Sequence, residues 1–219
     1  MPARTKIEVV RTIQNCAALY KENLSGKNLL FVTTHDNSAL CFETFFAPQN
    51  FMHLTGVKSR LNSDQFFRAS IGRRLSEDDI TLPRDGTVDL KLDALPQLMN
   101  IHTSARMVGD YDNTKPLLIT DKFAGTVTAA MGFVCINNFY MPNTALKKDV
   151  REITIQATRR KVAAIFVKYR NDAKYAKLTY IAKGIALDDE ILLKSIGSNV
   201  DLENLTADFS IPRKKQDTE

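Results

Sequence analysis

Apolar residues recur at helical spacing in several segments of the chain. In the first segment, Val10, Ile13 and Ala17 fall on one face with polar residues between them, and Ser25-Gly26 is a stop signal. The same reasoning predicts helices over residues 5–24, 64–74, 90–108 and 187–197. The acidic, polar stretch at residues 76–84 is predicted to form a loop or a short helical turn.

Short apolar runs bounded by turn residues predict strands. The run that begins after Asn28 is followed by Asp36-Asn37 and then by a second run that Pro48 ends, which is the pattern of a β-hairpin. Gly132, inside a later run, is expected to mark a bulge or a close backbone approach. Strands are predicted over residues 28–34, 38–46, 117–120, 126–137, 162–168 and 178–182, the last two joined as a second hairpin.

Composition limits the class of protein. The chain has 219 residues, 44% of them hydrophobic, which suits one domain with embellishments or two small ones. No apolar run approaches the roughly 18–20 residues of a membrane-spanning helix, and the N-terminus lacks a secretory apolar block. The cysteines Cys16, Cys41 and Cys135 form no Cys-x-x-Cys pair. This pattern favours a reducing, cytoplasmic setting and argues against a disulfide framework or a structural zinc site.

Positive charge is concentrated late in the chain. Residues 147–183 hold eleven Lys or Arg against three acidic residues, whereas the remainder holds nineteen against twenty-two. This asymmetry is typical of proteins with a phosphate-rich partner, although a solvated lysine-rich surface has the same composition. The sequence has no glycine-rich phosphate loop and no tight carboxylate cluster, so neither a cofactor nor a metal ion is expected.

The stretch Phe51-Met52-His53-Leu54-Thr55-Gly56 holds the first candidate for chemistry. Imidazole titrates near neutral pH, and the Thr55 hydroxyl and Lys58 follow His53, so proton transfer beside a phosphate is one reading. The alternative is structural, with a partly buried, hydrogen-bonded His53 beside a glycine turn. Of the remaining histidines, His35 is expected in an exposed loop, and His102 is expected to have a structural role.

Several motifs together resemble the phage-associated nuclease domains of the barnase–EndoU–colicin–RelE superfamily, in particular the group with a Phe-x-His-Leu-x-Gly signature. That signature is residues 51–56, and the resemblance spans residues 10–185. The further motifs are Leu117-Leu118-Ile119-Thr120-Asp121-Lys122, Met131-Gly132-Phe133, Tyr140-Met141-Pro142-Asn143-Thr144 and the hairpin at 162–183. The resemblance implies an α+β fold with N-terminal helices packed on an antiparallel β-sheet, and RNA cleavage that needs no metal.

The same resemblance organises the chain into parts. Residues 1–185 would be a single nuclease-like α+β domain, within which residues 77–113 resemble an insert. Residues 186–219 fall outside the resemblance and would be a C-terminal helix and a charged tail.

RNA cleavage assigns roles to particular side chains. RNA supplies its own nucleophile, the ribose 2′-hydroxyl, so the protein must move protons and stabilise negative charge on the phosphate. His53 is expected to be the general acid or base, Lys122 to meet the phosphate, and Arg151 or Lys168 to stabilise the transition state. The side chains expected to contact nucleic acid are Thr55, Lys58, Tyr140, Thr144, Lys168, Arg170, Lys174 and Tyr175. The two tyrosines could stack on an unpaired base, and the alternative for both is packing in the core.

A phage- or mobile-element-linked ribonuclease, acting as a toxin, is therefore the first hypothesis. Its partners would be RNA, such as tRNA or another structured RNA, and an immunity or antitoxin protein, with no membrane partner. The alternative is a non-catalytic nucleic-acid-binding or inhibitor protein that uses the basic hairpin within residues 147–183 and does not need His53. A structural or assembly protein with a basic face is the third hypothesis.

Overall fold

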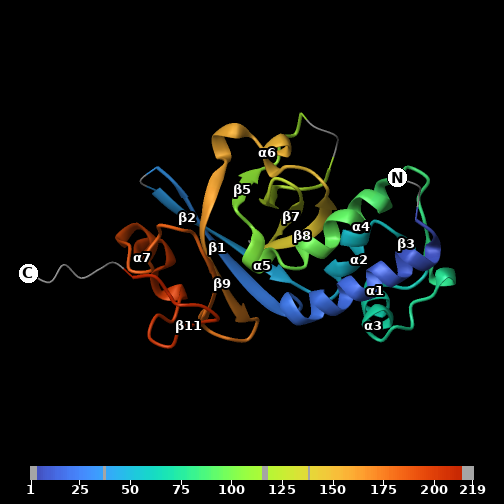
Figure 1. The fold of residues 1–219 in the computed structure, drawn as a ribbon, viewed down its shortest axis with the longest axis horizontal. Helices are drawn as coiled ribbons and strands as arrows, with labels where there is room; N and C mark the ends of the chain where they lie inside the picture. Colours follow the sequence, from blue (N-terminus) through green and yellow to red (C-terminus); the bar gives the residue numbers. More distant parts are fainter. Residues whose placement is uncertain (1–3, 37, 115–117, 138, 214–219) are drawn as a thin grey trace, which may run out of the picture.

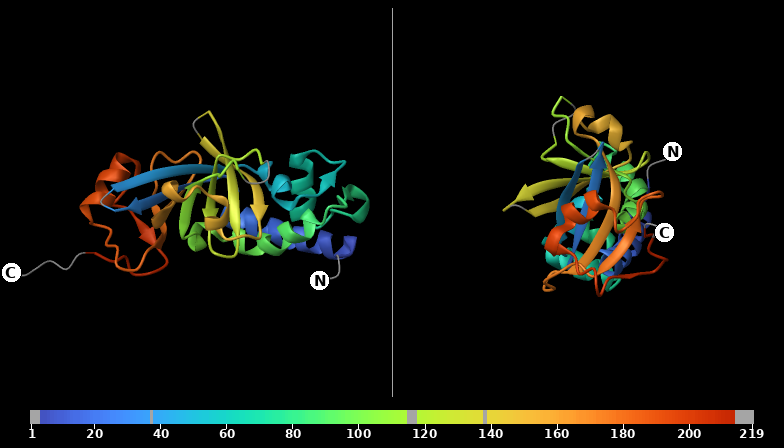
Figure 2. Two further views of the ribbon diagram at one scale, coloured as in Figure 1. Left: turned by 90° about the horizontal axis from the view of Figure 1, so that it is seen from above. Right: turned by 90° about the vertical axis from the view of Figure 1, so that its left-hand side faces the viewer.

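A β-barrel forms the centre of the protein in a computed structural model that describes residues 4–36, 38–114, 118–137 and 139–213. Helices cover one end of the barrel, and residues 185–211 pack against the outer face of the strands at residues 27–35 and 160–169 (Figures 1 and 2). The strands of the ring are hydrogen-bonded in the order β1 (Lys27–His35), β2 (Ser38–Phe46), β8 (Phe139–Leu146), β7 (Ala130–Ile136), β6 (Lys122–Gly125), β5 (Met107–Asp110) and β9 (Arg160–Tyr169). Pairing of β9 with β1 closes the ring.

Further strands lie outside this ring. β10 (Lys177–Ile181) pairs with β9, and β11 (Thr206–Ala207) pairs with β10. A separate small sheet joins β3 (Lys58–Ser59) and β4 (Ile80–Thr81).

The helices precede, interrupt and follow the strands. They are α1 (Lys6–Asn23), α2 (Asn50–Thr55), α3 (Ser63–Ile71), α4 (Thr87–Leu98), α5 (Ile101–Ser104), α6 (Val150–Ile153) and α7 (Glu190–Ile196), with short 3₁₀ turns η1 (Glu77–Asp79), η2 (Gln156–Thr158) and η3 (Gly197–Asn199). A capping box starts α1, because the Thr5 hydroxyl accepts from the Glu8 amide and the Glu8 carboxylate accepts from the Thr5 amide. No helix among the described residues is both long and apolar enough to cross a bilayer.

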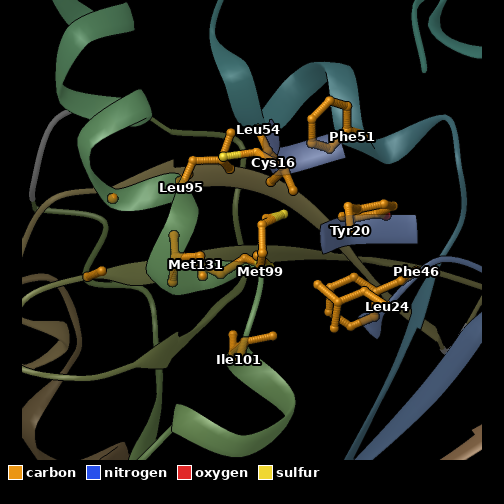
Figure 3. Packing of buried hydrophobic residues seen from close by; sticks show 14 of the residues in the cluster. Cys16, Tyr20, Leu24, Phe46, Phe51, Leu54, Leu95, Met99, Ile101 and Met131 are labelled. Atoms are coloured by element: carbon orange, nitrogen blue, oxygen red, sulfur yellow. The ribbon is translucent and has the colours of Figure 1, made fainter. Parts of the chain in front are cut away.

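The main hydrophobic core lies between the barrel and the first five helices, α1 to α5. Figure 3 shows Tyr20 of α1 facing Phe46 of β2 and Phe51 of α2, with ring centroids 6.1 and 5.3 Å away. The Tyr20 hydroxyl donates to the main-chain oxygen of Ala47 at 2.8 Å, so its polar end is satisfied despite full burial. The N-terminal helices and the first hairpin therefore form one packed unit.

Most predicted elements are confirmed. The helices expected at 5–24, 64–74 and 187–197 correspond to α1, α3 and α7, and both predicted hairpins are present. The prediction for Gly132 is also confirmed. The register of β7 against β8 shifts there, and a Cβ at Gly132 would lie 2.7 Å from the Thr144 methyl.

The helix predicted over 90–108 is too long. Pro96 lies inside α4, which ends at Leu98, and residues 107–110 instead form β5 between β6 and β9. The apolar spacing at the end of that segment predicts a helix, but hydrogen bonding to β6 and β9 makes these residues a strand.

The strand predicted over 117–120 is also wrong for the residues of this segment that the structure describes. Residues 118–120 lie outside any strand, Leu117 lies outside the described residues, and the strand begins at Lys122. β8 was not predicted from the sequence. Its Pro142 lies beside the register shift between β7 and β8, where a residue without an amide proton is tolerated.

The α+β class is confirmed, but the simple antiparallel sheet is not. β2 and β8 pair in parallel at Thr44 and Tyr140, β10 and β11 are parallel, and the sheet closes on itself. The sheet closes because β9, which is six strands away from β1 in the pairing order, also pairs with β1. The division into 1–185, with an insert at 77–113, and 186–219 stays a prediction.

Candidate functional site

The outer face of β1, β2 and β9 carries a row of polar side chains. The register places Asn28 opposite Phe45 and Lys168, and the next outward row places Leu30 opposite Glu43 and Phe166. Paired residues point to the same face, and alternate residues along a strand share that face. Asn28, Glu43 and Lys168 therefore face away from the core that the N-terminal helices cover.

Glu43 is held by donors from two distant parts of the chain. One carboxylate oxygen, Oε1, accepts from the Tyr175 hydroxyl at 2.6 Å and from the Asn28 amide nitrogen at 3.1 Å. Burial, and then the bond to Glu43, raises the pKa of Tyr175, so the phenol remains a donor. This arrangement fixes the carboxylate in one orientation and occupies only one of its oxygens.

A cavity of about 280 Å³ opens beside this carboxylate. Its lining residues are Asn28, Glu43, Phe45, Phe139, Met141, Lys168 and Arg170. The Lys168 ammonium lies 4.7 Å from the Tyr175 ring centroid, and the Arg170 guanidinium lies 4.3 Å from that of Phe45. Among the described residues, neither cation has a carboxylate partner within ion-pair distance. Aromatic rings thus position both cations without neutralising them.

Part of the residue set expected from the sequence meets in this cavity. Lys168 and Arg170 line it, and Tyr175 contacts two of the lining residues, Lys168 and Glu43. Exposed Lys174 lies on the turn that joins β9 and β10. Tyr175 is 2% exposed and its hydroxyl is engaged, which favours core packing over stacking for this ring.

The three expected catalytic residues lie on separate elements. His53 is exposed on α2, the Lys122 ammonium on β6 contacts the Asp110 carboxylate, and Arg151 at α6 forms a fork with Asp149 at 2.5 to 3.1 Å. Within the described part of the chain, no hydrogen bond or ion pair joins any two of the three. Figure 1 places α2 among the N-terminal helices at the right and α6 at the top of the barrel, above β5.

The remaining expected contacts are scattered. Thr55 is buried and donates to the main-chain oxygen of Met52 at 2.7 Å, and Thr144 is buried in β8. Lys58 is exposed on β3, and Tyr140 packs against Phe42 with the Lys122 ammonium 5.7 Å from its ring centroid. The structure does not bring these side chains into the Glu43 cavity.

Asn28, Glu43 and Phe45 were not predicted from the sequence as site residues. A signal for Glu43 was present, because a single carboxylate stands inside the apolar run of residues 39–46. A charge within an otherwise apolar strand requires a partner or a function.

Comparisons with known proteins identify the family. The chain matches the family model described as phage-Barnase-EndoU-ColicinE5/D-RelE like nuclease 4 over residues 12–184, which is most of its length. Searches of curated proteins and of solved structures found no match. The resemblance inferred from residues 51–56 and the later motifs is thereby confirmed. The chain belongs to the phage-associated Barnase–EndoU–colicin–RelE-like nucleases of that family.

Proposed function

We propose that this nuclease cleaves RNA at the Glu43 cavity without a metal ion. The observation that carries the proposal is an oriented carboxylate sharing a cavity with Lys168 and Arg170. A nuclease of this family acts on nucleic acid. RNA is the proposed substrate class because an oriented carboxylate can take the proton of the ribose 2′-hydroxyl, which RNA carries and DNA lacks.

Glu43 would act as the general base in this reaction. Its carboxylate takes the proton of the 2′-hydroxyl, whose oxygen then attacks the adjacent phosphorus. Arg170 forms bidentate contacts with the phosphate oxygens, and its charge stabilises the five-coordinate transition state. The 5′ oxygen leaves with a proton from the Lys168 ammonium, giving a 2′,3′-cyclic phosphate and a 5′-hydroxyl.

The set of His53, Lys122 and Arg151 remains the competing site for the same reaction. The two sites are separable because they share no residue and lie on different elements. Substituting one residue from each therefore shows which set performs the chemistry.

The test is cleavage of single-stranded RNA by purified protein in the presence of a chelator. Glu43→Gln keeps an oxygen that can accept from Tyr175 and Asn28 but removes the base, so cleavage should fall about 10²- to 10⁴-fold. Glu152→Gln, at an exposed carboxylate of α6, is the matched control and should cleave like the wild type. His53→Ala should also retain cleavage.

Two other outcomes would overturn this assignment. Loss of cleavage in His53→Ala, with full activity in Glu43→Gln, would move the reaction to the α2 site. Salt-sensitive RNA binding without cleavage by the wild type would support the nucleic-acid-binding alternative.

A further inference from the structure

A second polar cavity lies behind the proposed active site, on the other face of the sheet. Its volume is about 420 Å³, and it is enclosed by the end of α1, by α5, by β10 and by residues 208–209. Lys27 and Val167 line this cavity, whereas their sequence neighbours Asn28 and Lys168 line the Glu43 cavity. Alternation along β1 and β9 thus separates the two sites.

Two lysines in this cavity repel each other. Burial and the charge of Lys177 lower the pKa of Lys27, whose ammonium donates to the main-chain oxygen of Glu22 at 2.6 Å. Lys177 pairs with Asp208 at 3.0 Å, but the Asp208 side chain is 84% exposed. An exposed ion pair of this kind contributes little to stability, so another anion can replace the Asp208 carboxylate.

A histidine completes the polar wall. Burial, followed by the charges of Lys27 and Lys177, lowers the pKa of His102 to about 4, and its Nδ1 atom is buried with no hydrogen-bond partner among the residues that the structure describes. The Thr179 hydroxyl donates to the main-chain oxygen of His102 at 2.6 Å, which fixes α5 on β10. The charged groups that line the cavity beside His102 are Lys27, Lys177, Glu22 and Asp208.

We propose that this cavity binds a phosphate group between Lys27, Lys177 and His102, with Asp208 as the internal anion that the phosphate displaces. A phosphate offers several acceptor oxygens, which can satisfy both ammonium groups at once. Its charge also offsets the repulsion between the lysines and favours a protonated imidazole. The phosphate can come from a nucleic-acid backbone or from a free ion, and the site does not depend on catalysis at Glu43.

The protein's histidine content makes this testable by proton NMR. The chain has three histidines, so the imidazole signals can be resolved, and His102→Gln assigns the signal of interest. Inorganic phosphate and a short single-stranded DNA, which lacks the 2′-hydroxyl and is not cut by the proposed reaction, are titrated separately. Either ligand, at constant ionic strength, should raise the pKa of His102 by about one to three units and leave the imidazole signals of His35 and His53 unchanged.

Two variants sharpen the result. Lys177→Ala should weaken the response, whereas Asp208→Asn should strengthen phosphate binding several-fold because the competing carboxylate is gone. A response to phosphate alone would assign the site to a free ion, and a response to DNA alone would assign it to a strand. An unchanged His102 signal in wild type and Asp208→Asn, or an unaltered response in Lys177→Ala, would overturn the proposal.

Discussion

At the scale of single residues, His102 shows how the fold changes ordinary side-chain chemistry. Burial and two nearby lysines lower its pKa to about 4, from about 6.5 for an unperturbed histidine. Between these values the unfolded chain binds a proton that the folded chain does not. His102 therefore lowers the free energy of unfolding as the pH falls from about 6.5 toward 4, and this loss is absent above pH 6.5.

His102→Gln should make unfolding less dependent on pH over this window. Each unit of pKa difference corresponds to about 1.4 kcal/mol, so the wild type should lose about 1–3 kcal/mol more than the variant between pH 7 and pH 4. Urea unfolding of both proteins across this range measures the difference. Parallel profiles would show that His102 titrates normally in the folded protein.

The Glu43 site shows which single residues the sequence could reveal. Lys168 and Arg170, which line the cavity, could be predicted as nucleic-acid contacts because they belong to one basic hairpin, which is a local pattern. Glu43 was missed because its phenolic partner, Tyr175, is 132 positions away. The surroundings of His102 could not be predicted either, because strand pairing rather than sequence spacing brings Lys27 and Lys177 near it.

At the scale of elements, the turn between β6 and β7 depends on a close backbone approach. A Cβ at Gly125 would lie 2.3 Å from the main-chain oxygen of Ala129 and 2.8 Å from the Cα atom of Ala130. Both contacts are with backbone, so no flexible side chain can move aside. The turn therefore admits no side chain at this position without displacement of a barrel strand.

Gly125→Ala should reduce stability by about 1–3 kcal/mol, the usual cost of overpacking. Val127→Ala is the matched control in the same turn, and because Val127 is 60% exposed its effect should stay within about 0.5 kcal/mol. Chemical denaturation of the two variants beside the wild type makes the comparison. Equal stability of Gly125→Ala and wild type would show that the turn relaxes freely.

The elements also show where sequence reasoning stopped. Both hairpins were predicted because apolar alternation and turn residues lie within about twenty positions of each other. β5 and β8 were missed because barrel pairing decides their conformation, and Pro142 weakens the strand pattern of β8. The pairing of β1 with β9, which closes the barrel, could not be predicted from local sequence patterns because the two strands are far apart in the chain.

At the scale of the whole molecule, the C-terminal residues cover apolar surface on the outside of the barrel. Leu30, Val32 and Phe166 of β1 and β9 form one buried cluster with Leu192 and other residues of the C-terminal part. Figure 1 shows α7 against this end of the sheet. The sequence placed residues 186–219 outside the nuclease-like domain, so their contribution to stability is a direct test of that boundary.

A chain that ends at residue 185 should be strongly destabilised. It would expose the cluster on β1 and β9, and each large side chain lost from such a cluster removes about 1.5–3 kcal/mol. Thermal unfolding and dye binding to exposed apolar surface measure the effect. If the shortened chain does not fold, Leu192→Ala in the full chain provides a milder form of the test, with half-exposed Ile191→Ala as its control. Wild-type stability of the shortened chain would instead support the boundary at 185.

Closure of the barrel by β9 also has a consequence during synthesis on the ribosome. Glu43 is made early, but Lys168, Arg170 and Tyr175 follow more than 120 positions later. At roughly 5–20 residues per second, the first hairpin waits many seconds for the strand that completes it. The proposed active centre thus cannot assemble on a nascent chain until β9 and Tyr175 have been made. Until then, the messenger and ribosomal RNA around the nascent chain would not be exposed to cleavage at the Glu43 cavity.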